Sequence, residues 1–325
     1  LYSKLRPNLN KVVVADEPGL ATSEMLPLIV NPEVLDRRYF AYLLRSNSFV
    51  NLAVSSTAGS KMPRMNKKTL LNAVFPIPSL ELQHQRIDLL SSIEKARTKA
   101  ELLIQQLDTL VKSRFIEMFG DPIRNPLRMS VSSVEELAAP IKNSMKAGPF
   151  GSALKKEVYA ESGYKVYGQE QVISGNQFLG NYYIDKEKYE QLNSCKVMPG
   201  DVLISLVGTV GKVLILSEDC QPGIINPRLV KITFDKRKIF PEYFAIAFSL
   251  ESVRSSLLGR AHGQTMNVLN LGMIKKLKLP VPPISRQKEY LNFVAQVDKS
   301  RFVAQQQIEK LQMLYDSLAQ EYFGD

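Results

Sequence analysis

The chain has 325 residues, a hydrophobic content of 45% and a formal net charge of +10 at pH 7. This length suffices for two domains with cores, and no run of 18 apolar residues is present that could span a bilayer. Its two cysteines, Cys195 and Cys220, and its two histidines form no metal-binding pattern, which argues against a zinc site and a disulfide framework. We therefore expect a globular, cytoplasmic protein.

The sequence repeats at an offset of 204 residues. The Pro-x-Pro segment at 76–78 falls on 280–282, and Phe-Gly-Asp at 119–121 falls on 323–325. So long a period indicates a whole domain followed by a helix, present twice, rather than the unit of a solenoid. Residues 1–3 align with 203–205 inside the second copy. We therefore expect an amino-terminally truncated first copy, which lacks the part equivalent to residues 122–202.

Positive charge gathers on the two predicted domains. Residues 1–78 carry ten Lys and Arg against five Asp and Glu, and residues 122–280 carry 21 against 14. The segments 79–121 and 281–325 are nearly neutral. Charge distributed in this way is typical of proteins that bind nucleic acid. In residues 1–78, the predicted C-terminal part of a first domain, the loop after Gly59 offers these candidates for DNA contact: Lys61, Arg64, Lys67 and Lys68.

The segments 79–121 and 281–325 are predicted to be long helical spacers. Each follows a Pro-x-Pro sequence, contains an uninterrupted helical pattern and would be roughly 60 Å long at 1.5 Å per residue. Apolar residues at alternating spacings of four and three predict an antiparallel coiled coil between the two helices. The expected interhelix seam comprises Leu89, Ile93, Leu103, Leu107 and Leu110 in the first helix and Phe293, Val297, Leu311, Leu314 and Leu318 in the second.

Residues 122–280 are predicted to be a β-rich domain. Candidate strands are 164–167, 181–184, 202–207, 212–217 and 228–234, and a helix is expected over 241–257, equivalent to about 36–53 in the first copy. The sequence at 208–212, Gly-Thr-Val-Gly-Lys, lacks the spacing of a phosphate-binding loop. A tight turn between two strands is the better interpretation.

Two loops of this domain carry residues suited to DNA. Lysines and glycine amides suit phosphates, whereas Gln and Asn can pair with adenine, and Arg or Lys with guanine. The candidates in the glycine-rich bend at 146–156 are Lys146, Ser152, Lys155 and Lys156. Those in the loop at 260–267, equivalent to the loop after Gly59, are Gln264, Thr265 and Asn267. Each loop alone could equally be a solvated turn.

The order and doubling of these segments resemble the DNA specificity subunit of type I restriction–modification systems. Matching pieces are residues 1–7, 208–213 and 280–287. The resemblance implies an α+β fold in which two β-rich target-recognition domains, the first incomplete, are separated by two helices that set the distance between half-sites. It implies a non-catalytic subunit without a cofactor, whose partners are double-stranded DNA, methylation subunits in two copies and, through them, restriction subunits.

Two other functions stay open. A truncated scaffold would dock the methyltransferase through its helices without reading DNA, and truncated chains could also associate with each other. A stand-alone enzyme would use carboxylates such as Asp201 and Asp219, but the sequence contains no nucleophile constellation to accompany them.

Overall fold

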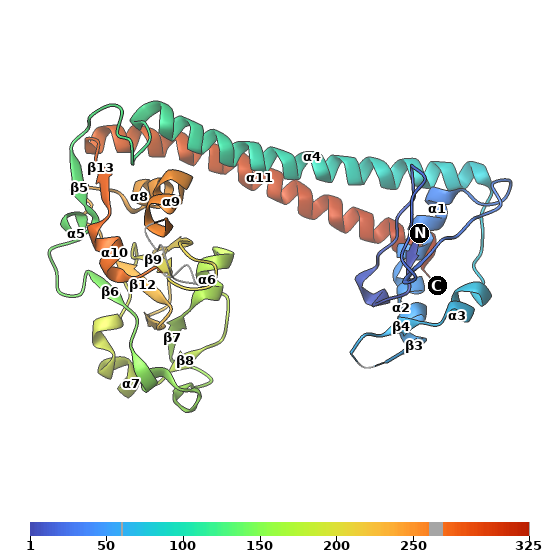
Figure 1. Ribbon diagram of the computed structural model, residues 1–325, viewed down its shortest axis with the longest axis horizontal. Helices are drawn as coiled ribbons and strands as arrows, with labels where there is room; N and C mark the ends of the chain where they lie inside the picture. The colour runs from blue at the N-terminus through green and yellow to red at the C-terminus, as the bar shows by residue number, and fades with distance from the viewer. Residues whose placement is uncertain (60, 260–268, 325) are drawn as a thin grey trace. The chain divides into compact units, whose positions relative to one another are not determined.

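The computed structural model of the protein describes residues 1–59, 61–259 and 269–324 (Figure 1). Contacts divide the chain into two compact units, Leu1–Gln106 with Ser300–Asp325 (unit 1) and Leu107–Lys299 (unit 2). Helix α4, Leu80–Phe119, and helix α11, Ile284–Phe323, each contribute one part to each unit. Among the described residues, no helix is both long and apolar enough to cross a membrane.

Unit 1 contains short strands and three helices beside its parts of α4 and α11. The elements are β1 Tyr2–Ser3, η1 Pro7–Leu9, β2 Met25–Leu26, α1 Arg37–Arg45, α2 Asn47–Ser55, β3 Thr57–Ala58, β4 Arg64–Met65 and α3 Lys67–Asn72. The pairs β1–β2 and β3–β4 are antiparallel. Tyr2 and Phe49 lie edge to face at 5.4 Å between ring centroids, at the centre of a small buried core.

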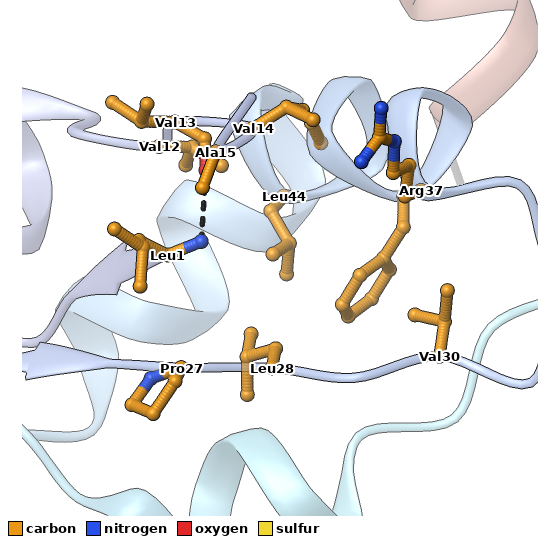
Figure 2. Close-up of a pocket in the computed structure, with 12 residues that line it drawn as sticks. Leu1, Val12, Val13, Val14, Ala15, Pro27, Leu28, Val30, Arg37 and Leu44 are labelled. Atoms are coloured by element: carbon orange, nitrogen blue, oxygen red, sulfur yellow. Dashed lines mark hydrogen bonds between the residues drawn. The ribbon is translucent and has the colours of Figure 1, made fainter. Parts of the chain in front are cut away.

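An apolar groove of about 270 Å³ lies open on this unit (Figure 2). Leu28 and Val30 line one side, and Leu44 and Phe40 of α1 line another. The Leu1 amino group donates a hydrogen bond of 2.8 Å to the Val13 carbonyl, which fixes the first residue beside the groove.

Unit 2 has more strands. Its elements are β5 Val131–Ser133, α5 Val134–Leu137, β6 Met145–Ala147, η2 Gly151–Leu154, η3 Lys156–Val158, β7 Tyr164–Tyr167, α6 Gln169–Ser174, β8 Tyr183–Ile184, α7 Lys186–Gln191, η4 Asn193–Cys195, β9 Val202–Ser205, β10 Val213–Ile215, β11 Gly223–Ile225, β12 Leu229–Ile232, α8 Pro241–Ser249, α9 Glu251–Leu258, α10 Leu271–Lys276 and β13 Lys278–Pro280.

Two sheets organise unit 2. One is antiparallel with strand order β10-β9-β12-β6, and the other has order β11-β7-β8, in which β11 runs parallel to β7. One core packs the helices and the end of α4 against β9 and β12, with Phe119 and Tyr243 at 5.1 Å. A second core joins the sheets through residues such as Leu203 and Ile224. The mixed α+β class predicted from the sequence is confirmed.

The repeat is reproduced residue by residue in the helices. The bounds of α1, α3 and α4, shifted by 204, are those of α8, α10 and α11. The Gln83 side chain accepts from the Asp36 amide and donates to the Val34 and Pro78 carbonyls. Gln287 makes the same three bonds at the equivalent positions, to the Phe240 amide and the Lys238 and Pro282 carbonyls. One buried amide therefore joins the domain to its helix in both copies.

The predicted helix over 241–257 is wrong in one respect, because two helices occupy it. Leu250 is extended, with ψ of 141°, and separates α8 from α9. In unit 1 the break falls at the equivalent Ser46, whose side chain accepts from the Phe49 amide and caps α2. The five predicted strands exist as β7, β8, β9, β10 and β12, mostly shorter than expected. The tight turn predicted over 208–212 joins β9 to β10 and uses Gly208 and Gly211, both at positive φ.

The interhelix seam needs a correction. Contacts between Arg86 and Tyr322 and between Arg97 and Gln312 show that α4 and α11 run antiparallel within unit 1. One predicted row is buried, with Ile93 and Val297 each 6% exposed. The other row lies one residue further along, so Leu90 and Val111 are buried. Four predicted seam residues are instead exposed, namely Leu89, Leu103, Leu110 and Leu314. The predicted and the observed second row both repeat every seven residues. The leucine pattern alone therefore did not show which of the two rows is buried.

Candidate nucleic-acid interface

The bend at 146–156 lies where the two sheets of unit 2 meet. Lys146 is half-buried within β6 and pairs in register with Lys231 of β12. Lys155 and Lys156 are exposed between and within the short helices η2 and η3, and Ser152 belongs to η2. Two of the predicted lysines are therefore available to a phosphate, whereas Lys146 is partly covered.

Backbone segments approach closely beside this bend. A Cβ atom on Gly148 would lie 1.8 Å from the Asn226 carbonyl oxygen, and one on Gly168 would lie 2.9 Å from the Asn226 side-chain nitrogen. Asn226 directly follows β11, and Gly168 directly follows the parallel strand β7. Glycine at 148 and 168 thus lets three segments meet at the carboxyl ends of two neighbouring strands.

A cavity of about 450 Å³ opens at these strand ends. We call it the polar crevice. Crevices at the carboxyl ends of parallel strands are common ligand sites in α/β proteins. Its polar side chains are Gln169, Glu170, Asn226 and Arg228, and its apolar and aromatic wall comprises Leu154, Tyr159, Val166 and Tyr182.

Hydrogen bonds fix the polar side chains of the crevice. The side-chain nitrogen of Gln169 donates to the Val207 carbonyl, and its side-chain oxygen accepts from Arg228 Nη1 at 3.5 Å. The Asn226 side-chain oxygen accepts from the Arg228 backbone amide at 2.9 Å. The turn at 208–211, which begins next to Val207, is therefore tied to the crevice through Gln169.

A buried lysine holds the neighbouring loop. Lys165 is 1% exposed, and its ammonium group donates to the carbonyls of Phe178 and Gly180 at 3.1 and 3.0 Å. Burial lowers the pKa of Lys165, and burial likewise raises the pKa of Tyr159 in the crevice wall. Lys165 therefore acts as a fixed structural donor through its two hydrogen bonds, and Tyr159 forms part of the crevice wall.

The two carboxylates considered for a stand-alone enzyme, Asp201 and Asp219, are hydrogen-bonded to neighbouring residues. Asp201 is fully buried and accepts from the Met198 amide and from Lys231, whose nitrogen lies 3.4 Å from it. Asp219 accepts from the side chains of Ser217 and Gln177, and the Ser217 hydrogen bond is the main cause of its lowered pKa. Neither carboxylate lines the polar crevice.

In unit 1, three predicted lysines are exposed: Lys61 lies between β3 and β4, and Lys67 and Lys68 are the first residues of α3. Arg64 differs, because Glu24 holds its guanidinium at 3.0 Å. The hydrogen bond between them raises the pKa of Arg64 and lowers that of Glu24. Gln264, Thr265 and Asn267 of unit 2 lie outside the described residues.

Comparison with known proteins identifies the family. The chain matches the type I restriction modification DNA specificity domain over residues 4–107 and 148–313, which is most of its length and includes both copies. The chain belongs to this family. Recognition of DNA sequence is the role of this family, and it is the function of this chain.

Similar specificity subunits have been characterised. The chain is 22% identical to the type I restriction enzyme MjaVIII specificity subunit of Methanocaldococcus jannaschii, over 90% of this chain and 71% of that protein. It is 21% identical to the EcoBI specificity subunit of Escherichia coli, over 89% and 65% respectively. A chain in a solved structure concerned with complex assembly and conformational transition of the type I R-M system has the same fold, with a TM-score of 0.60 and 16% identity over 90% of this chain and 72% of that chain.

The polar crevice was missed in the sequence. Its signal was available, because Gln169 and Glu170 come just after the predicted strand 164–167, and Asn226 comes just before the predicted strand 228–234. Polar residues that directly flank buried strands gather at a sheet edge, but only the parallel pairing of β7 with β11 brings these two strand ends together.

Proposed function

We propose that this chain acts as the non-catalytic DNA-reading subunit of a type I complex, with unit 2 as its principal reading domain. It would direct two methylation subunits, and through them restriction subunits, to a bipartite site on double-stranded DNA. We expect that complex to act in the cytoplasm. The domain boundaries we propose are 1–78 and 122–280 for the reading domains and 79–121 and 281–325 for the spacer helices.

The observation that carries this proposal is a polar crevice bordered by exposed lysines on a basic domain. Lys155 and Lys156 adjoin Leu154 of the crevice wall. Phosphate contacts position a protein on DNA, and base contacts inside a groove provide the specificity. The lysines beside the crevice could contact phosphates, and the amides and the guanidinium inside it could contact bases.

The spacer helices would provide the docking surface for methylation subunits. Leucines displaced from the predicted seam, such as Leu89 and Leu103, face outward with 42% of each side chain exposed. Phe302 and Val303 of α11 are exposed by 63% and 62%. Contiguous apolar patches mark sites of interaction between proteins, and these residues would contribute to such a patch on the spacer helices.

The test replaces Lys155 and Lys156 together by Ala and measures affinity for a DNA duplex as a function of salt concentration. Each lost phosphate contact should reduce the slope of log affinity against log salt by about 0.9, so the double variant should lose roughly two. Lys186→Ala with Lys236→Ala, which removes two exposed lysines elsewhere on unit 2, is the matched control.

The alternative is the scaffold that docks the methyltransferase but does not read DNA. Wild-type protein that binds methylation subunits, yet binds every duplex equally, would favour the scaffold. An unchanged salt slope in the Lys155 and Lys156 variant would remove this rim from the DNA interface while leaving recognition to other surfaces.

A further inference from the structure

The polar crevice has a rigid floor. A Cβ atom at 148 would collide with the Asn226 backbone, and one at 168 would lie 2.9 Å from the Asn226 side-chain nitrogen, so Asn226 is closely enclosed by both segments. The backbone amide of Asn226 also donates to the Tyr167 carbonyl at 2.9 Å, which continues the β7–β11 pairing beyond the strands. Side chains that rise from such a floor keep their positions when a ligand approaches, and this lowers the entropic cost of binding.

Arg228 is held by its crevice neighbours at both its backbone and its side chain. Asn226 accepts from its backbone amide, and Gln169 accepts from its guanidinium. The guanidinium carries five N–H donors in a planar fork, so one contact with Gln169 orients it and leaves donors directed outward. Arg228 is itself exposed at the crevice.

We infer that the polar crevice reads a G·C base pair, with Arg228 donating to the guanine edge and Gln169 positioning Arg228. This inference rests on the proposed function of DNA recognition by unit 2. Guanine presents O6 and N7 as two adjacent acceptors in the major groove, and a guanidinium fork matches them bidentately. Gln169 contributes through the orientation of Arg228.

Glu170 favours a base over a phosphate as the ligand. Its carboxylate lines the same crevice and accepts from the Gln171 side chain at 3.2 Å. A carboxylate repels a phosphate, but it accepts a hydrogen bond from the N4 amino group of the cytosine that pairs with guanine. Donors on Arg228 and an acceptor on Glu170 therefore match the two halves of one base pair.

The experiment uses the full chain co-purified with its methylation subunits and a library of DNA duplexes with randomised positions. Bound duplexes are sequenced for the wild type and for Arg228→Ala, Arg228→Lys and Gln169→Ala. Arg228→Ala should reduce the preference for G·C at one position roughly ten-fold, and Arg228→Lys should keep overall affinity while losing most of that preference. Gln169→Ala should weaken the preference at the same position.

Arg237→Ala is the matched control. Arg237 lies past the other end of β12, is paired with Asp235 at 2.9 Å and should leave every preference unchanged. A uniform loss of affinity in Arg228→Ala, with preferences intact, would make Arg228 a phosphate contact and overturn the inference. Unchanged preferences in all three variants would overturn it as well. Wild-type protein without any sequence preference would instead refute the proposed function itself, before any variant is compared.

Discussion

The two copies of the repeat differ in how far one pair of equivalent apolar residues is covered. In unit 2, Phe234 is 4% exposed and packs on Phe244 at 4.6 Å, while its backbone bridges to Ala138 next to α5. The equivalent residues of unit 1, Val30 and Phe40, line an open groove (Figure 2). Residues 131–195 of unit 2 thus add the cover of this face and one side of the polar crevice, whose other side includes Asn226 and Arg228.

This contrast predicts the largest difference in stability. Phe234→Ala should lower the free energy of unfolding of unit 2 by about 3–5 kcal/mol, because it leaves a cavity in a closed core. Val30→Ala, at the equivalent position, should cost about 1 kcal/mol or less, because Val30 is already half-exposed. Urea unfolding of the two variants and the wild type measures both values.

The outcome that would break the comparison is a large cost for Val30→Ala. It would mean that the groove of unit 1 is covered in solution. Dilution then separates the explanations, because a cover provided by a second copy of the chain makes the cost depend on protein concentration, whereas an intramolecular cover does not.

The buried glutamines provide the converse of this comparison, because at these positions the two copies have the same hydrogen bonds. Gln83 and Gln287 are each fully buried and each make three hydrogen bonds to equivalent partners. Replacement by Leu leaves one amide and two carbonyls unsatisfied, and should cost about 2–4 kcal/mol in either unit. Urea unfolding should report similar losses for Gln83→Leu and Gln287→Leu.

Gln85→Leu, on the exposed face of α4, is the control and should change stability little. If Gln287→Leu proved much more costly than Gln83→Leu, the junction between domain and helix would be tighter in unit 2 than the shared hydrogen bonds imply. The additional stability would then come from the surrounding core, in which Tyr290 and Phe115 lie 5.6 Å apart between ring centroids.

The sequence predicted what periodicity and repetition encode. The offset of 204 located α4 and α11, and one row of their contact residues, because both are properties of spacing along one chain. The second row was misplaced since Leu89 and Leu103 fit a heptad as well as Leu90 and Ile104 do. Local pattern does not tell which of two adjacent apolar rows meets a partner helix.

The candidate site was predicted less well, for a different physical reason. Lys155 and Lys156 became candidates for DNA contact because a cluster of lysines beside a glycine-rich bend can be recognised from the sequence alone. Gln169 and Arg228 did not, because they are 59 residues apart and meet only through the parallel pairing of β7 with β11. The ion-pair partner of Arg64 was not foreseen for the same reason, since Glu24 is 40 residues distant.

The smallest predicted effect concerns how equivalent helices begin. Asp36 caps α1 by accepting from the Arg38 and Tyr39 amides at 2.6 and 3.3 Å, whereas α8 begins with Pro241, and the residue at its N-cap, Phe240, makes no side-chain cap. Asp36→Ala should therefore cost unit 1 about 1 kcal/mol. Asp36→Asn should keep most of the stability, because Asn caps a helix about as well as Asp. Urea unfolding of the two variants measures the difference.

The pair of variants also separates the cap from a charge effect. His84 Nε2 lies 3.5 Å from an Asp36 carboxylate oxygen, so the charge of Asp36 is a second possible source of its contribution. If Asp36→Asn lost as much stability as Asp36→Ala, the charge and not the cap would carry the effect. Equal stability of Asp36→Asn and wild type would assign it to the cap, a device that unit 1 uses where unit 2 relies on the fixed φ of a proline.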